Sequence, residues 1–164
     1  MRATFELLEL SRLADEALRK AFPAKARTQT AYPPWVYPPD GHLPFIERNA
    51  VVLPGVGSSA VVLEFRVPLG MDGVIKRVSN LYLGGGFVSG SGDIIWRILA
   101  DGRAVRNFAN ITSEYGSLSS PIDVDGIRIY SGQLIQYTVT HVANLALGDL
   151  TLCHLSGYYY PSSS

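Results

Sequence analysis

An amphipathic pattern opens the chain and gives way to short alternating runs after Gly41. Residues 4–21 carry apolar side chains at alternating spacings of three and four, which predicts one amphipathic helix. Acidic residues near its start and basic residues near its end suit the helix dipole, and Phe22-Pro23 ends the pattern. At 1.5 Å per residue the helix would be about 25 Å long. Its apolar positions are Ala3, Leu7, Leu10, Leu13, Ala14, Ala17, Leu18 and Ala21.

A stretch rich in proline and aromatic residues follows the predicted helix. Residues 31–41 read Ala-Tyr-Pro-Pro-Trp-Val-Tyr-Pro-Pro-Asp-Gly. Proline fixes φ and lacks an amide donor, so this stretch is neither helix nor central strand. We expect a stiff, polyproline-like arm that reaches about 35 Å at roughly 3.1 Å per residue. Its aromatic side chains prefer to lie on a surface, either the chain's own β domain or a neighbouring subunit.

The predicted helix has an apolar stripe that needs cover. A lone helix of this length is marginally stable in water, and the stiff arm separates it from the rest of the chain. The helix either folds back on its own domain or docks on a partner or a symmetry mate. We favour docking on a partner or a symmetry mate, because the arm is stiff and its reach exceeds a domain radius. The expected attachment residues are Leu7, Leu10, Ala14, Ala17, Leu18, Tyr32, Trp35 and Tyr37.

The remaining sequence predicts short β-strands separated by turn residues. The expected fold is mainly β, an antiparallel sandwich or jelly roll of about eight strands, preceded by one amphipathic helix and the arm. The expected parts are residues 1–27 (attachment or oligomerisation helix), 28–48 (arm), 49–161 (β-sandwich domain) and 162–164 (tail). The predicted strands and hairpins cover 49–53, 59–67, 74–83, 93–108, 121–130, 133–142 and 149–160.

Alternation within these runs predicts which side chains face the core. Residues 59–67 place Val61, Leu63, Phe65 and Val67 on one face, and residues 133–142 place Ile135, Tyr137, Val139 and His141 on one face.

Two hairpins are centred on Asp-Gly pairs. Asp101-Gly102 is the stronger turn signal. A two-residue turn would pair Arg97 with Arg106, so we favour a three-residue loop that pairs Trp96 with Phe108. A second hairpin is expected about Asp125-Gly126.

Composition narrows the class of function. Lys and Arg number 14 and Asp and Glu number 14, so there is no basic excess for nucleic acid or an anionic membrane. Apolar residues make up 47% and charged residues 17%, as in a globular protein. The single cysteine, Cys153, excludes an internal disulfide and reads as a buried small hydrophobe. Glu6 and Glu9 among the leucines argue against a secretory signal, so we expect folding in a cytoplasm.

The candidate chemistry is sparse. The three histidines, His42, His141 and His154, show no metal spacing and read as core-edge or surface residues. Cys153 and His154 are neighbours in a strand and point to opposite faces. The Gly84–Gly92 stretch lacks the lysine of a phosphate-binding loop and reads as a loop at the sandwich edge. A glycosidase-like pair among Glu64, Asp93, Asp101 and Glu114 has no local pattern to support it.

The sequence therefore predicts no enzyme, no cofactor and no metal. Tyr158, Tyr159 and Tyr160 end the last strand, with Tyr158 and Tyr160 on one face. One interpretation is that these tyrosines pack at the end of the strand. The other is that they contact another subunit or stack against a sugar.

Four stretches carry a resemblance to a known family. Residues 72–80 (Asp-Gly-Val-Ile-Lys-Arg-Val-Ser-Asn), 95–103 (Ile-Trp-Arg-Ile-Leu-Ala-Asp-Gly-Arg), 129–135 (Ile-Tyr-Ser-Gly-Gln-Leu-Ile) and 155–161 (Leu-Ser-Gly-Tyr-Tyr-Tyr-Pro) resemble small β-sandwich virion proteins of tailed bacteriophages. The resemblance is one of texture and covers roughly residues 73–161. It implies a head decoration, a collar or head fibre, or a tail-associated fibre. Such proteins are multimeric, often trimeric, and attach through an N-terminal helix or arm.

Two classes of function follow. The first is a structural protein of a virion, assembled in the host cytoplasm as a homo-oligomer, a trimer being favoured. It would be anchored to capsid, neck or tail proteins by its helix and arm. The second is a carbohydrate-binding module that reads a host glycan with tyrosine and tryptophan platforms. No nucleic-acid or membrane partner is expected.

Overall fold

The computed structural model describes residues 32–117, 119–146 and 148–162. The predicted helix, and with it Leu7, Leu10, Ala14, Ala17 and Leu18, lies outside the described residues. Within the described part, no helix is long and apolar enough to cross a membrane. Its elements are β1 (Leu43–Val52), β2 (Ser59–Arg66), β3 (Met71–Leu83), β4 (Ile94–Ala100), β5 (Arg103–Ala104), the 3₁₀ turn η1 (Arg106–Phe108), β6 (Ile122–Ile129), β7 (Leu134–His141) and β8 (Leu150–Pro161).

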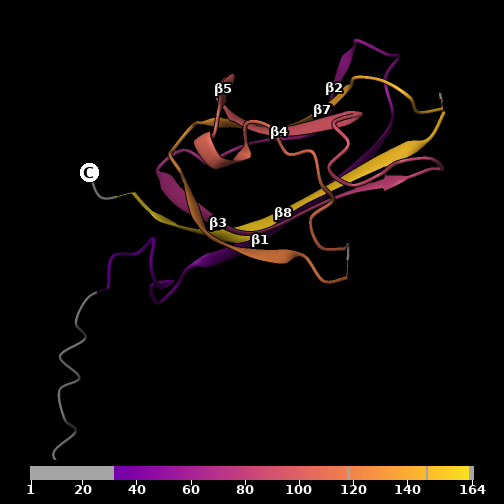
Figure 1. Cartoon of the computed structure of the whole chain (residues 1–164). Helices are drawn as coiled ribbons and strands as arrows, with labels where there is room; N and C mark the ends of the chain where they lie inside the picture. The colour runs from indigo at the N-terminus through magenta and orange to yellow at the C-terminus, as the bar shows by residue number, and fades with distance from the viewer. Residues whose placement is uncertain (1–31, 118, 147, 163–164) are drawn as a thin grey trace, which may run out of the picture. The chain divides into compact units, whose positions relative to one another are not determined.

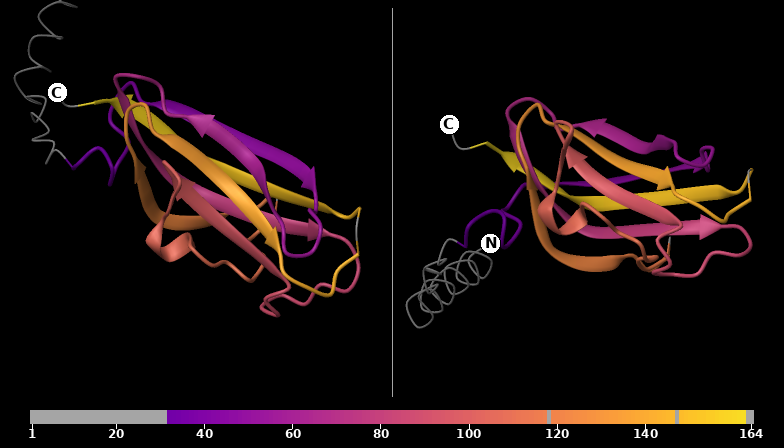
Figure 2. Two further views of the ribbon diagram at one scale, coloured as in Figure 1. Left: turned by 90° about the horizontal axis from the view of Figure 1, so that it is seen from above. Right: turned by 45° about the horizontal axis from the view of Figure 1, so that its top comes forward.

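The eight strands form two antiparallel sheets that pack face to face (Figure 1). Sheet A has the order β1-β8-β3-β6 and sheet B the order β2-β7-β4-β5. Therefore β1 pairs with β8, β2 with β7, β3 with β6 and β4 with β5, as in one long antiparallel hairpin that is wrapped into two sheets. This is the strand order of an eight-stranded jelly roll. The predicted fold class is confirmed, and the views in Figure 2 show the strands of the two layers.

The core between the sheets is apolar but contains two hydrogen bonds that join one sheet to the other. The fully buried Trp96 donates its indole N–H to Oγ1 of Thr151 over 2.9 Å. The fully buried Tyr137 donates its hydroxyl to Oδ1 of Asn80 over 3.1 Å. Trp96 and Tyr137 come from sheet B, and their partners come from sheet A. Because buried polar groups need partners, these bonds fix how the sheets are placed over each other.

Alternation predicts β7 correctly and β2 only in part. Ile135, Tyr137, Val139 and His141 are all buried, as expected. In β2 the register shifts between Val61 and Leu63, so that Val62 is an extra residue. The bulge turns Val61 outward, where it is 43% exposed, and buries Val62 beside Leu63.

The first Asp-Gly pair forms a two-residue turn, so the preferred three-residue loop is wrong. Asp101 and Gly102 have φ of 49° and 75°, and Ala100 pairs with Arg103. Asp and Gly tolerate positive φ at both central positions of such a turn. The unfavourable pairing of Arg97 with Arg106 does not form, because β5 ends at Ala104 and Arg106 already belongs to the turn η1. The backbone of Trp96 pairs with Ile111 instead of Phe108.

The second Asp-Gly pair makes no hairpin. Residues Ile122–Ile129 form one strand, β6, that runs through Asp125 and Gly126. Gly126 has a φ of 99°, and the register with β3 shifts at this level. The glycine therefore allows an irregularity within an edge strand rather than a reversal of the chain.

The proline-rich stretch is not a straight arm over its described residues. Residues 34–36 and 40–41 are turns, and the second turn is closed by a bond from the amide of His42 to the carbonyl of Pro39. Gly41, with a φ of 78°, takes the position of this turn that requires a positive φ. Proline suits turn corners as well as polyproline helices. β1 then begins at Leu43, six residues before the predicted start of the β domain at residue 49.

A substitution at Gly157 tests the packing of β8 against β3. A Cβ atom there would collide with the carbonyl oxygen of Val74, and this backbone cannot move without breaking the pairing of the two strands. We expect Gly157→Ala to lower the free energy of unfolding by about 3 kcal/mol or more, measured by urea denaturation. Gly85→Ala is the matched control, because its Cβ meets nothing within 4 Å. Equal losses in the two variants would contradict the close approach of these strands.

Candidate interaction site

Part of the arm, from Pro34 to His42, lies against the outer face of sheet A. A small apolar cluster of Val74, Tyr158 and Tyr160 is buried there, separate from the core between the sheets. The hydroxyl of Tyr158 donates to the carbonyl of Pro34 over 3.0 Å. The ring of His42 meets that of Tyr158 edge-on, with centroids 5.5 Å apart. The arm is therefore tied to the strands by polar and aromatic contacts.

Trp35 is the second tie. The guanidinium carbon of Arg128, on β6, lies 3.6 Å from the centre of the Trp35 ring. A cation over the face of tryptophan is attracted by the ring's quadrupole. Trp35 remains 36% exposed, so one part of the side chain rests on the domain and another faces outward.

The other large side chains of the arm are open. Tyr32 is 65% exposed, Val36 53% and Tyr37 68%. Of the three aromatic residues predicted for attachment, the structure places Trp35 on the chain's own domain and leaves Tyr37 exposed, whereas Tyr32 belongs to the separate unit Met1–Pro33. We call Val36 and Tyr37 the arm tip. Contact of the arm tip with another subunit stays a prediction.

The tyrosines at the end of β8 divide between the faces as alternation predicts. Tyr159 points into the core and stacks on Phe45 with a centroid distance of 4.5 Å, whereas Tyr158 and Tyr160 lie outside, in the cluster with Val74. Burial, with the nearby Glu47, raises the pKa of Tyr159 to about 12. All three are less than a tenth exposed. They therefore present no open ring face on which a sugar could stack.

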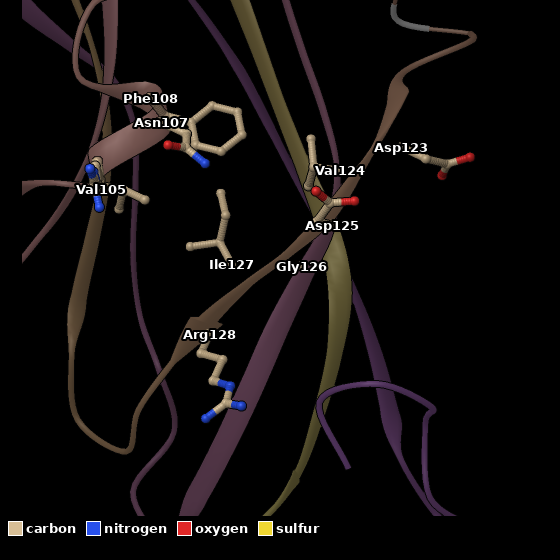
Figure 3. A pocket seen from close by; sticks show the side chains of 10 residues that line it. Val105, Asn107, Phe108, Asp123, Val124, Asp125, Gly126, Ile127 and Arg128 are labelled. Atoms are coloured by element: carbon tan, nitrogen blue, oxygen red, sulfur yellow. The ribbon is translucent and has the colours of Figure 1, made fainter. Parts of the chain in front are cut away.

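A groove of about 700 Å³ lies between η1 and β6. Figure 3 shows Val105 and Phe108 on one wall and Val124 and Ile127 on the other, all directed into the cavity. The side chain of Arg128 is directed away from it. The lining of the groove is mixed, because Arg106, Asn107, Asp123, Asp125 and Arg128 line it together with these four apolar residues.

The carboxylates weighed as a glycosidase pair are held apart in separate bonds. Glu64 accepts from Gln136, Asp93 from Ser91 and Asn144, Asp101 from the amide of Leu134, and Glu114 from the amide of Tyr82. Among residues 32–162, apart from the two positions left undescribed, no three His, Cys, Asp or Glu side chains are grouped so as to hold a metal ion.

Two of the three histidines are buried, although all three read as core-edge or surface residues; for His141, strand alternation had already indicated the inner face. His42 is exposed, but His141 is fully buried and its Nδ1 donates to the carbonyl of Pro54 over 2.8 Å. Cys153 is buried in the core, and His154 lies on the opposite face of β8, as predicted.

His154 sits in the middle of the outer face of sheet A. It is only 3% exposed, between Arg48 on β1 and Ser79 on β3, which pair with it directly. Neither ring nitrogen has a hydrogen-bond partner in the part of the chain described. Burial and the charges of Arg48 and Arg77 lower the pKa of His154 below its usual 6.5. The strand pattern placed this ring outside but gave no sign that neighbours cover it.

Arg128 is the site residue that the sequence did not reveal. It lies far along the chain from Trp35, and no local pattern links the two. One hint of a partner was present in the sequence: a tryptophan in a proline-rich stretch tends to rest on a cationic or aromatic side chain. Many residues of the chain could supply such a side chain, so the hint does not select Arg128.

No protein-family model and no curated protein matches this sequence. Among solved structures, the crystal structure of FLHE is similar at 16% identity and a TM-score of 0.39, over 73% of this chain and 99% of that one. A chain of the cyanophage Pam1 capsid asymmetric unit is similar at 17% identity and a TM-score of 0.41, over 83% of this chain and 96% of that one. At such identities and TM-scores below 0.5, neither likeness assigns a function.

The contact between Trp35 and Arg128 can be tested by fluorescence. Trp96 is fully buried, so acrylamide quenching of the native protein reports mainly on Trp35. We expect Arg128→Gln to increase quenching, because the loss of the cation removes about 0.5–1 kcal/mol that holds the ring down. Arg103→Gln, at an exposed arginine of β5, should leave quenching at the parent value. Identical quenching in both variants would rule the contact out.

The buried His154 predicts acid sensitivity. Because its pKa is lower in the folded than in the unfolded chain, the unfolded state binds the proton more readily. The contribution of the neutral ring is present in full above about pH 7 and is lost as the pH falls below about 6.5. We expect His154→Gln to flatten the dependence of the free energy of unfolding on pH in this range. An NMR titration of the ring gives the pKa directly, and a value at or above 6.5 would contradict the prediction.

Proposed function

We propose that this chain is a structural protein of a tailed-phage particle. In this proposal the jelly roll projects from the particle, and the front of the chain, residues 1–48, attaches it to capsid, neck or tail proteins. The protein works by binding and is not an enzyme. Several copies act together, a trimer being the favoured number, and multivalency makes weak single contacts durable.

The observation that carries the proposal is the arm tip. Val36 and Tyr37 are exposed directly after Pro34 and Trp35, which contact Tyr158 and Arg128. A pre-positioned apolar tip loses little conformational freedom when it binds, so more of its contact energy is available for affinity. The jelly roll, an architecture used by viral capsid proteins, supports the same reading, as does the sequence resemblance to small virion proteins.

The arrangement of polar groups supports binding over catalysis. The carboxylates engage separate partners. Of the two buried histidines, His141 lies on the inner face of sheet B and His154 on the outer face of sheet A. A general acid or base needs to reach a substrate in a shared cleft.

Incorporation into particles tests the proposal. In particles purified from the phage that encodes the chain, we expect the protein at a fixed copy number, measured by quantitative mass spectrometry. A Val36→Asp chain should be largely lost from the particles while its thermal unfolding is unchanged, because a charge at the arm tip would be buried on attachment. Val88→Asp is the matched control, at a loop valine that is 65% exposed, and should be incorporated normally. Absence of the parent chain from purified particles would refute the function, and normal incorporation of Val36→Asp would refute the role of the arm tip.

A further inference from the structure

The outer face of sheet A has an apolar end that the described chain leaves open. β8 carries apolar side chains on both of its faces near its start, with Leu150 and Leu152 outside and Cys153 and Leu155 inside. A strand that is apolar on both faces is typical of a sheet covered on both sides. Here sheet B covers only the inner side.

Strand register gathers these side chains into two complete rows. Ala50, Leu152 and Leu81 lie side by side on β1, β8 and β3, and Val52, Leu150 and Leu83 form the next row. Val52 is 57% exposed, Leu83 54% and Leu150 41%. We call these six residues the outer patch. Contiguous apolar patches of this kind mark interaction sites more often than scattered apolar residues do.

Two buried polar side chains and a hollow lie next to the outer patch. The adjoining row contains His154 and Ser79, whose buried polar atoms have no partner among the described residues. Beyond it, a hollow of about 520 Å³ runs over Ile46, Ser156 and Arg77 to Pro38 of the arm. Patch, row and hollow follow one another along the strands, with the buried row between the two open parts, and we call this stretch of the outer face the trough. Ile46 and Val52 are six residue steps apart on β1, about 20 Å at 3.3 Å per residue.

The first part of the chain has the length and the apolar stripe to cover this trough. The sequence of residues 4–21 predicts a helix of about 25 Å with one apolar stripe. Its other positions carry charges of both signs, four acidic (Glu6, Glu9, Asp15 and Glu16) and three basic (Arg12, Arg19 and Lys20). Beside the hollow the sheet also offers both signs, because Arg77 is paired with Asp123 over 2.8 Å. Pro34, bonded to Tyr158, lies on this same face.

We propose that the outer patch is the docking site for residues 4–21 of a neighbouring copy of this chain. This inference rests on the multimeric assembly of the proposed function, and it assigns the N-terminal segment to contacts between copies and the arm tip to the particle. Each copy then has one stripe to donate and one patch to fill. Such a head-to-tail contact closes into a ring when the rotation between copies is a whole fraction of a turn, and every stripe and every patch is then used.

Cysteine cross-linking between two differently tagged full-length chains tests this directly. One chain carries Leu10→Cys and the other Val52→Cys, so that no single chain can form the bond within itself. The native Cys153 is buried and present in both. After co-expression and mild oxidation we expect a disulfide-linked species, containing both tags, at twice the chain mass of 17.8 kDa. The matched control pairs Leu10→Cys with Val61→Cys, an exposed valine of sheet B, and should give none.

Each other outcome overturns the proposal. A bond that forms only within a chain carrying both Leu10→Cys and Val52→Cys would mean that the segment covers its own domain. A strong Val52→Cys homodimer would mean that two outer patches face each other. No bond in any combination would place the segment elsewhere. Because these measurements use the isolated protein, they succeed or fail independently of incorporation of the chain into particles.

Discussion

The pairing of β8 with both β1 and β3 is the constraint on which the rest of the molecule depends. This one register places Thr151 where it accepts the indole proton of Trp96 from the opposite sheet. It also aligns the aliphatic rows of the outer patch and puts Tyr158 beside Val74, under the arm. Gly157 permits the close approach at the point where Lys76 is an extra residue in β3. A shift of one residue would exchange the two faces of β8 and destroy all of these contacts at once.

The periodicity of the sequence predicts the fold class because several strands, β4 and β7 above all, alternate with a period of two. β7 is the clearest case, with its alternate side chains buried as expected. The predictions fail where an extra residue interrupts the period, as at Val62 in β2 and near Gly126 in β6. A bulge depends on the partner strand, and therefore on contacts that are distant in sequence. The turn at Asp101-Gly102 shows a related limit, since the chain avoids the unfavourable arginine pair by ending β5 early rather than by changing the turn.

The candidate site was only partly predictable, for the same reason. Local composition singled out Trp35 and Tyr37, because aromatic residues in a proline-rich stretch need an explanation. It could not supply Arg128, which reaches Trp35 only after sheet A has formed. It also suggested a straight arm, since proline favours both polyproline geometry and turn corners and the sequence does not choose between them. The apolar residues on both faces of β8 were visible in the sequence, but their meaning depends on β1 and β3 carrying matching rows.

Two apolar surfaces of different kinds thus lie on one face of sheet A, and their chemistry suits different partners. The arm tip is small, rigidly based and aromatic, and it projects from the sheet. Such a surface inserts into a pocket that another protein already provides, and rigid aromatic groups do so at low entropic cost. The outer patch is an aliphatic surface of two rows across three strands, and it suits the apolar stripe of an amphipathic helix. If one protein covered both surfaces, it would have to match a projecting aromatic tip and an aliphatic patch on one face. Division of the two surfaces between a foreign protein and a second copy needs no such match, and it lets copies assemble before they attach.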